Sequence, residues 1–277
     1  MSDAASVERA ARRAMRGDIA RVRTYAFAGI DAIPVEVQVQ IAAGVPSMVV
    51  VGLPDKAVGE ARERVRAALT AMGLSMPARR VLINLAPADL LKEGSHFDLP
   101  IALGVLAAMD VLPRDEMDGY AALGELSLDA TIKPVAGILP AAIAAAGAGL
   151  GLICPPSQGG EAAWAGEVEV LAPEDLLQLI NHMRGTQVME PPRPSGLATA
   201  IPGPDLADVR GMETARRALE IAAAGGHNLL LIGPPGAGKS MLAARLVGLL
   251  PDLLPAEALE VAMVHSARRP PDRLVGG

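Results

Sequence analysis

The sequence predicts an α+β domain followed by the beginning of an α/β P-loop domain. Three observations lead to this prediction. Strands and helices with one hairpin fill the first two thirds of the chain, a proline-rich stretch follows, and the motif GPPGAGKS then separates an apolar run from a helical one. A length of 277 residues also favours two domains. We expect an extension at 1–20, a first domain at 21–185, a linker at 186–204 and a partial second domain at 205–277.

The composition predicts the kind of core the protein has and argues against several classes of protein. Half of the residues are hydrophobic (51%) but only 2% are aromatic, so the core is expected to consist of Ala, Val, Leu and Ile. The net charge of −6 argues against strong non-specific nucleic-acid binding by the whole chain. The single cysteine, Cys154, is expected to be a buried, reduced thiol. No uninterrupted apolar run reaches about 18 residues, so we expect no membrane span and a cytoplasmic location.

The first half of the N-terminal domain alternates strands and helices. Apolar and polar residues alternate from Val35 to Ile41, which predicts a half-buried strand. Asp55 is a typical N-cap, and Gly73 is a typical stop for the helix between them. Further strands are predicted at 48–51 and 81–85, and a buried helix at 99–109.

The second half of that domain is expected to begin with a hairpin around 128–131. Helices at 138–146 and 174–184 and strands at 150–154 and 168–171 follow, with Trp164 expected in the core. Five prolines lie between residues 186 and 204, where little apolar periodicity remains, and this composition indicates an extended linker.

The second domain contains the strongest motif of the chain. An amphipathic helix at 212–224 precedes an apolar run at 228–232, which predicts a buried strand, and a helix is predicted from 241 to 247. The loop between this strand and this helix fits the pattern GxxxxGK[ST], whose glycines let backbone amides surround phosphates at a helix N-terminus. The expected nucleotide-binding residues are Gly233, Pro234, Pro235, Gly236, Ala237, Gly238, Lys239, Ser240 and Met241. Lys239 is expected to reach the β- and γ-phosphates of ATP, and Ser240 to hold Mg²⁺.

P-loop ATPases also need an acidic residue at the end of a second strand, and the sequence after the loop offers no such residue. Only 38 residues follow Lys239, and none of them forms an apolar run that ends in Asp or Glu. Glu257 and Glu260 lie on a helix-like stretch, 255–264. We therefore expect a phosphate cradle without the hydrolytic half, with weak nucleotide binding and little or no turnover.

Two further features have alternative interpretations. Arg9, Arg12, Arg13 and Arg16 fall on one helical face, which is compatible with a transit peptide or a basic arm, but a solvated terminal extension is the favoured interpretation. His96 lies near Asp98, so a functional cluster is conceivable, although a cap or packing role is favoured.

Several segments discussed above resemble the YifB family of magnesium-chelatase-like AAA+ ATPases, which includes ComM-type proteins. The resemblance covers about residues 21–266. Its most specific stretches are TYAFAGIDA (24–32), VGLPD (51–55), NLAPAD (84–89), EGSHFDLP (93–100) and AAGGHN (223–228).

The resemblance implies a Lon-protease-like N-terminal domain of the ribosomal-protein-S5 type and a AAA+ motor that uses ATP and Mg²⁺. It implies DNA as a partner, a homo-hexamer, and a branch-migration helicase acting in DNA recombination during natural transformation. In the family the motor continues beyond about Ser266, with an acidic strand, sensors and an arginine finger that are absent here. The alternatives are a magnesium chelatase motor subunit and a non-enzymatic fragment for DNA binding or assembly.

Resemblance to Lon also raises the alternative of a Ser–Lys protease. In Lon-type domains the nucleophilic serine follows a Lys-Asp-Gly-Pro segment, and the matching position here is His96, one residue after Ser95. The position of the partner lysine falls on Leu139, which cannot accept a proton. The resemblance therefore implies a domain without proteolytic activity.

Overall fold

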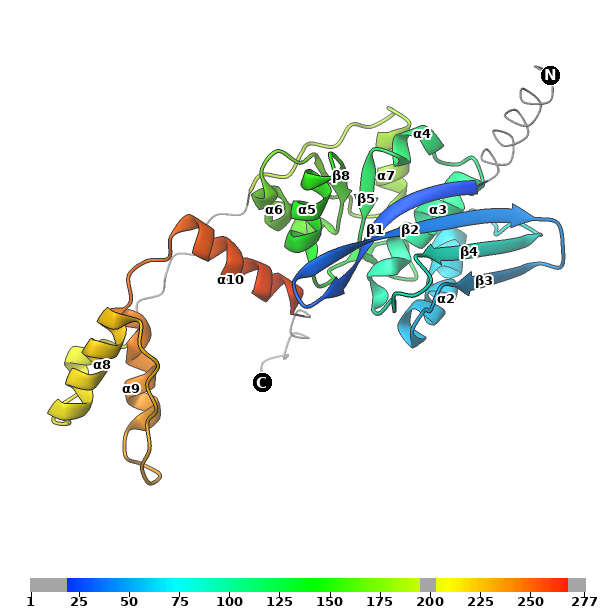
Figure 1. Ribbon diagram of the computed structural model, residues 1–277. Coiled ribbons are helices and arrows are strands. Elements are labelled where there is room, and N and C mark those ends of the chain that lie inside the picture. The colour runs from blue at the N-terminus through cyan, green and yellow to red at the C-terminus, as the bar shows by residue number, and fades with distance from the viewer. Residues whose placement is uncertain (1–18, 195–202, 269–277) are drawn as a thin grey trace, which may run out of the picture. The chain divides into compact units, whose positions relative to one another are not determined.

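The computed structural model describes residues 19–194 and 203–268 (Figure 1). The basic segment from Arg9 to Arg16 and part of the proposed linker lie outside the described residues. Contacts divide the chain into two compact units, one of residues 1–195 with 260–277 and one of residues 196–259. Each unit is described by itself below.

The N-terminal unit is built on a mixed sheet of seven strands in the order β3-β4-β2-β1-β5-β8-β9. The pairs β1–β2 and β2–β4 are antiparallel, and the other neighbouring strands are parallel. A mixed sheet with helices confirms the prediction of a domain that combines α and β elements. The strands are β1 (Ile19–Ala28), β2 (Asp31–Ala42), β3 (Ser47–Val51), β4 (Arg80–Ala86), β5 (Tyr120–Ala122), β8 (Gly151–Ile153) and β9 (Val170–Leu171).

The predicted strand and helix at the start of this unit are confirmed. In β2, Val35, Val37 and Val39 are buried, while the residues between them are half-buried, because successive side chains point to opposite faces of a strand. Between β3 and β4 runs α2 (Lys56–Ala71), and the Asp55 carboxylate accepts a hydrogen bond from the backbone nitrogen of Val58 at 2.7 Å. Asp55 is therefore the N-cap that its sequence position predicts.

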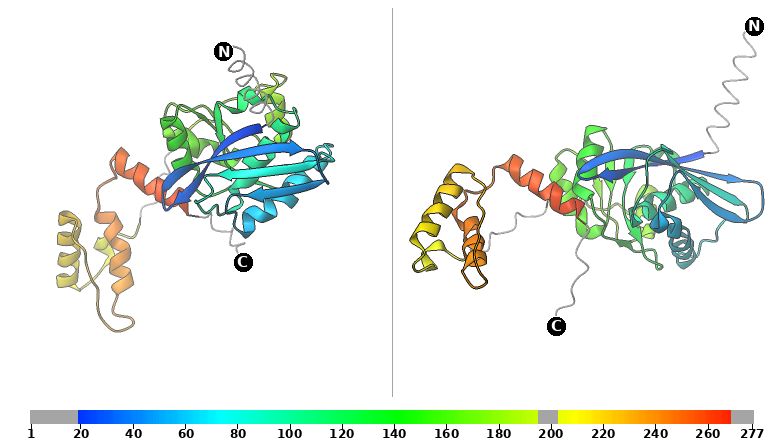
Figure 2. Two further views of the ribbon diagram at one scale, coloured as in Figure 1. Left: turned by 45° about the vertical axis from the view of Figure 1, so that its right-hand side comes forward. Right: turned by 60° about the horizontal axis from the view of Figure 1, so that its bottom comes forward.

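Two helices cover one face of the sheet. Helix α3 (Asp98–Ala108) packs on β1 and β2, and α2 packs against α3 (Figures 1 and 2). A Cβ atom on Gly104 would lie 2.6 Å from Cγ2 of Val39, so only glycine allows this close approach of helix and sheet. Helix α7 (Leu176–Met183) contributes Leu176, Leu179 and Ile180 to the same core.

A second, smaller core contains α5 (Ile138–Gly147) and residues of β1, β5 and β8. Tyr25 of β1 belongs to this core, whereas Val22 and Ala26 belong to the larger one, so the alternation of β1 serves both faces. Cys154 is buried here, as predicted, and burial raises the pKa of its thiol to about 12.

Short elements complete the unit. The predicted hairpin is confirmed as β6 (Glu125–Leu126) and β7 (Ile132–Lys133), which pair antiparallel. Helices α4 (Arg114–Met117) and α6 (Gly159–Ala162) have no counterpart among the predicted elements. The core prediction for Trp164 is wrong, because its side chain is 42% exposed on the single turn of 163–165 after α6.

The second unit contains helices but no strand among its described residues. It comprises α8 (Glu213–Gly225), α9 (Lys239–Leu246) and the start of α10 (Pro255–Ala267), which confirms the three predicted helices. The predicted strand at 228–232 is wrong: this segment is irregular, and Leu230 and Ile232 are 80% and 86% exposed. A strand needs hydrogen-bonding neighbours, and residues 203–268 supply none. No helix in the part of the chain that the structure describes is long and apolar enough to cross a membrane.

A buried ion pair joins three elements of the N-terminal unit. Arg64 of α2 donates from Nε and Nη2 to the Asp98 carboxylate at 2.5 and 2.9 Å. The backbone nitrogen of Leu126 in β6 donates to the same carboxylate at 3.2 Å. Burial raises the pKa of Asp98, and the hydrogen bonds from Arg64 act in the opposite direction. This carboxylate therefore depends on Arg64 to remain charged in the core.

We expect Arg64→Met to destabilise the protein by about 3–5 kcal/mol at neutral pH, because it leaves a fully buried carboxylate without its cation. The matched control is Arg66→Met on the exposed face of the same helix, which should cost less than about 0.5 kcal/mol. Urea denaturation followed by circular dichroism measures both. Equal losses in the two variants would show that the Asp98 pair contributes no special stability.

Limited digestion with subtilisin, which cuts exposed chain with little sequence preference, tests the independence of the two units. Arg193 is exposed in an irregular stretch, whereas the described part of the C-terminal unit exposes Leu230 and Ile232 and has a small core cluster of four buried residues. We expect cleavage at or soon after Arg193, a resistant N-terminal fragment and rapid loss of the C-terminal one. Mass spectrometry of the fragments gives the outcome. A protected fragment starting near residue 205 would contradict this expectation.

Candidate functional site

The predicted phosphate-binding loop lies at the N-terminus of α9. Gly236 and Gly238 have φ angles of 81° and 80°, in the left-handed region that glycine adopts without strain. Gly238 is the N-cap, and the first intrahelical bond after it joins the Leu242 nitrogen to the Gly238 oxygen at 3.0 Å. The amide groups of the first turn therefore have no acceptor within the helix and are free to bind an anion.

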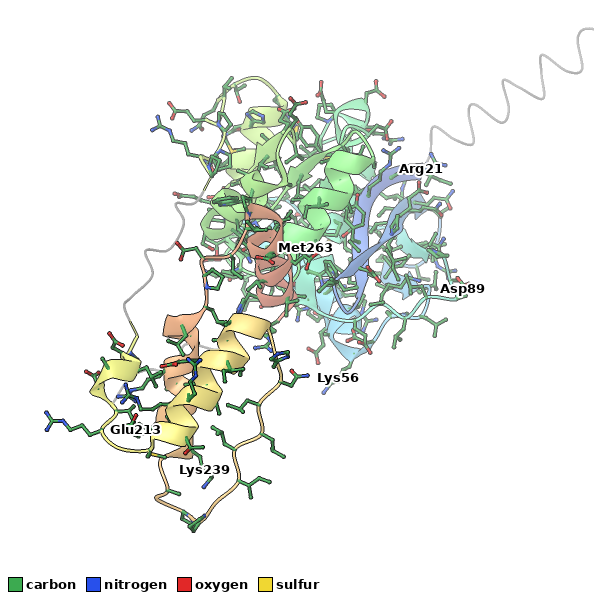
Figure 3. All side chains as sticks on the ribbon, turned by 60° about the vertical axis from the view of Figure 1, so that its left-hand side comes forward. Arg21, Lys56, Asp89, Glu213, Lys239 and Met263 are labelled. Carbon is green, nitrogen blue, oxygen red and sulfur yellow. The ribbon has the colours of Figure 1, made fainter. Side chains whose placement is uncertain are left out.

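Lys239 is the first residue of α9, and its side chain folds back over the loop (Figure 3). Its ammonium donates to the carbonyl oxygens of Gly233 and Pro234, each at 2.8 Å. The lysine thus bridges the two ends of the loop and is half-buried, while Ser240 is exposed beside it. Lys239 and Ser240 therefore both lie in the first turn of α9.

The loop fits a phosphate group of ATP. Backbone amides, a helix N-terminus and one ammonium group converge on the loop, and the two carbonyl contacts of Lys239 are exchangeable for phosphate oxygens. The Ser240 hydroxyl is a suitable ligand for Mg²⁺ that is held mainly by phosphates. Glu257 of α10 accepts a hydrogen bond from the Leu254 nitrogen at the start of its own helix, at 2.8 Å.

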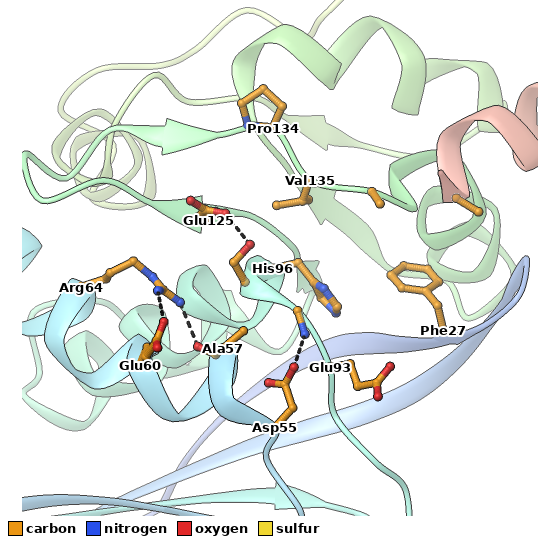
Figure 4. A pocket seen from close by; sticks show the side chains of 14 residues that line it. Phe27, Asp55, Ala57, Glu60, Arg64, Glu93, His96, Glu125, Pro134 and Val135 are labelled. Carbon is orange, nitrogen blue, oxygen red and sulfur yellow. Dashed lines mark hydrogen bonds and ion pairs between the residues drawn. The ribbon is translucent and has the colours of Figure 1, made fainter. Parts of the chain in front are cut away.

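The N-terminal unit contains a second candidate site, a cavity of about 740 Å³ (Figure 4). Its walls come from segments that are distant in sequence: Phe27 at the end of β1, the first turns of α2, the stretch 93–96, the β6 strand, the stretch 134–136 and Ala267 at the end of α10. The stretches 93–96 and 134–136 belong to the segments that resemble the nucleophile and lysine segments of Lon. Tertiary structure therefore brings them to one cavity.

Ser95 and His96 differ in their surroundings. The Ser95 hydroxyl donates a hydrogen bond to the Glu125 carboxylate. His96 is buried, and its Nε2 lies 3.0 Å from the carbonyl oxygen of Tyr25. Its ring also packs against Phe27 and Phe97, with ring centroids 5.4 and 4.3 Å apart. His96 therefore has a packing role, which is one of the two roles favoured from its sequence position.

Neither residue is arranged as an activated protease nucleophile. Leu139, at the position that the resemblance gives to the lysine, is buried in α5 and does not line the cavity. Burial lowers the pKa of His96 to about 4, and the hydrogen bond to Tyr25 acts in the opposite direction. The imidazole is neutral at pH 7, with its Nε2 proton committed to a backbone carbonyl.

Sequence reasoning missed three charged residues of this cavity, namely Glu60, Arg64 and Glu125. Arg64 is 34 residues from Asp98, and Glu125 is 30 residues from Ser95, so no local pattern joins the partners. Lys92 lies four residues before His96 in sequence but does not line the cavity. It is fully buried, and its ammonium donates to the Pro87 carbonyl rather than to the cavity.

Comparisons with known proteins match both units. The family model described as subunit ChlI of Mg-chelatase matches residues 37–158, and the model described as magnesium chelatase, subunit ChlI, matches residues 205–273. YifB of Escherichia coli is 44% identical over 245 residues, which are 88% of this chain and 48% of YifB. Competence protein ComM of Haemophilus influenzae is 40% identical over 259 residues, which are 90% of this chain and 50% of ComM.

A lon protease homologue of Methanothermobacter thermautotrophicus is 43% identical over 70 residues, which are 25% of this chain and 13% of that protein. This short match does not show a Lon-like fold for the N-terminal domain, which stays a prediction. The chain spans about half the length of YifB and ComM.

The buried imidazole of His96 is expected to lower the free energy of unfolding as the pH falls. Its pKa of about 4 in the folded protein is below the ordinary value of 6.5, so its contribution to stability is complete above pH 6.5 and is lost as pH falls toward 4. We expect this contribution to be about 3 kcal/mol. In His96→Phe, which retains the aromatic packing, the loss of stability between pH 7 and pH 4 should be smaller by about that amount.

Urea denaturation at several pH values measures the difference. The comparison uses the pH dependence of each protein, so a lower stability of His96→Phe at pH 7 does not affect the result. Parallel pH profiles for the two proteins would contradict the assignment of a depressed pKa to His96.

Proposed function

Because this chain belongs to the magnesium-chelatase-like family that includes YifB and ComM, we propose that residues 233–241 bind ATP together with Mg²⁺. The observation that supports the proposal is the geometry of the loop. The Lys239 ammonium donates hydrogen bonds to the carbonyl oxygens of Gly233 and Pro234. It lies at the start of a helix whose first-turn amides have no acceptor within the helix. Phosphate oxygens are the ligands that match this set of donors.

Each group has a distinct part in this proposal. The first-turn amides and the helix dipole hold phosphate oxygens, and the Lys239 ammonium leaves its carbonyl partners for the β- and γ-phosphates. The Ser240 hydroxyl holds Mg²⁺, which neutralises charge between the phosphates when bound. No described residue between 241 and 268 places a carboxylate at the end of a strand beside this loop. Binding without efficient hydrolysis is therefore the activity proposed for this chain.

For the longer family proteins we propose ATP-dependent remodelling of DNA, with branch migration in a homo-hexamer as the specific activity. The support is the similarity of about 90% of this chain to ComM, whose name marks it as a competence protein. In this proposal the chain supplies the phosphate loop and the N-terminal domain. The N-terminal domain is proposed to act in assembly or partner binding and not in proteolysis, because Leu139 replaces the basic residue that would activate a serine.

The second candidate function is a magnesium chelatase motor subunit, and the descriptions of both matching family models favour it. Against this, YifB and ComM align with 88–90% of this chain, so their similarity includes the N-terminal unit as well as the phosphate loop. We therefore favour the ComM-like function. A non-enzymatic fragment for assembly is the alternative if nucleotide does not bind.

Replacement of the loop lysine tests the proposal. We expect Lys239→Ala to weaken binding of a fluorescent ATP analogue in the presence of Mg²⁺ by at least tenfold, because the variant loses the ammonium group that is proposed to exchange its carbonyl partners for phosphate oxygens. Lys56→Ala is the matched control, since this lysine is exposed on the first turn of α2 in the other unit. It should leave the affinity unchanged.

Two results would contradict the proposal. Equal affinities of the wild-type protein and Lys239→Ala would exclude the loop as the phosphate site. Steady-state ATP turnover comparable to that of ordinary P-loop motors, if abolished by Lys239→Ala, would show that a hydrolytic carboxylate is present after all. A phosphate-release assay on the full chain distinguishes this second outcome.

A further inference from the structure

The cavity of the N-terminal unit is strongly acidic. Four carboxylate side chains line it, from Asp55, Glu60, Glu93 and Glu125. The cation among its lining residues is Arg64, which makes two hydrogen bonds to the buried Asp98 outside the cavity. The charge of Arg64 is therefore already balanced, and the cavity presents a net negative surface to a ligand.

The carboxylates come from three separate elements. Asp55 and Glu60 belong to the start of α2, Glu93 precedes the turn at 95–97, and Glu125 belongs to β6 (Figure 4). Asp55 is fixed by the Val58 and Gly94 amides, at 2.7 and 3.2 Å, and Glu125 is fixed by the Ser95 hydroxyl. Asp55 and Glu125 are held in place by these contacts, and all four carboxylates line one volume, which distinguishes them from a solvated acidic helix face.

His96 supplies an independent polar group in this cavity. The side chain is 93% buried, and its Nε2 must donate to the Tyr25 carbonyl, because a carbonyl oxygen only accepts. In the neutral ring Nδ1 is then an acceptor, and it is not one of the fully buried atoms that lack a partner. Nδ1 lies on the side of the ring that faces Gly94, another residue of the cavity lining. A donor from a ligand in the cavity can therefore reach it.

One wall of the cavity is aromatic. The Phe27 ring lines the cavity and is tilted by 60° against the His96 ring, at a centroid distance of 5.4 Å. The face of a phenyl ring attracts ammonium and guanidinium groups. Carboxylates, a neutral imidazole acceptor and a phenyl face are together complementary to a cation that carries several N–H donors.

We propose that this cavity binds an arginine or lysine side chain of a basic peptide segment on a partner protein. A volume of about 740 Å³ is within the range of ligand sites and accommodates such a side chain with its flanking backbone. The guanidinium or ammonium group pairs with Glu93 and Glu125, donates to Nδ1 of His96 and lies near the Phe27 ring. The acidic lining repels phosphate, so nucleic acid does not fit this cavity. The described residues contain no group of three His, Cys, Asp or Glu side chains suited to a metal ion.

The test uses the full chain and a fluorescein-labelled peptide, Gly-Arg-Gly-Arg-Gly, with a citrulline peptide as the uncharged counterpart. We expect Glu93→Gln/Glu125→Gln to weaken binding of the arginine peptide at least tenfold at constant ionic strength. The matched control is Glu63→Gln/Glu190→Gln, which removes two exposed carboxylates outside the cavity and should weaken binding less than twofold. The citrulline peptide should not bind.

A second measurement does not depend on the double variant. The arginine peptide should shift the imidazole ¹⁵N resonances of His96 and leave those of His182, which accepts a hydrogen bond from Met189, in place. If the double variant does not fold, Glu93→Gln by itself replaces it, because Glu93 is exposed and its loss spares the core.

Three outcomes would overturn the proposal. Equal weakening in the cavity and control variants would show non-specific attraction to the acidic protein. Equal binding of the citrulline peptide would exclude recognition of the cation. Displacement of the peptide by spermidine at the same concentration of positive charge would show that the cavity takes any small polycation. Each is independent of nucleotide binding, which Lys239→Ala reports.

Discussion

The N-terminal unit depends on one buried carboxylate, that of Asp98. It accepts two hydrogen bonds from Arg64 and one from the Leu126 amide, and so ties α2, α3 and the β6–β7 hairpin together. Burying such a charge is costly unless it is paired and its lone pairs are used, and this geometry meets both conditions. The pair therefore fixes how three elements from different parts of the chain meet.

The cavity follows from that arrangement. Ser95 and His96 lie three and two residues before Asp98, and Glu125 directly precedes Leu126, so groups held next to the ion pair also line the cavity. Asp55 serves twice, as the cap of α2 through the Val58 amide and as a partner of the Gly94 amide. The stabilising contacts of the core and the shape of the cavity are thus the same interactions, which leaves little freedom to change one without the other.

The phosphate loop follows a different principle, because its geometry is local. Glycines with positive φ at 236 and 238, the start of α9 and Lys239 all lie within a few residues, and the lysine closes the loop on its own carbonyl oxygens. Residues 203–268 place no strand beside this loop. Leu230 and Ile232, which lie just before the loop, have largely exposed side chains.

The sequence by itself determined the features that depend on neighbours along the chain. Alternation in β2, the Asp55 cap, the bounds of most helices and the loop at 233–240 follow from backbone bonds over three or four residues or from a strict period of two. Tertiary structure alone decided that residues 228–232 form no strand in this chain, that Trp164 is exposed, and that Arg64 and Glu125 join His96 at one cavity. The physical reason is that strand pairing, burial and ion pairing need partners 30 or more residues away, as Ser95–Glu125 and Arg64–Asp98 show.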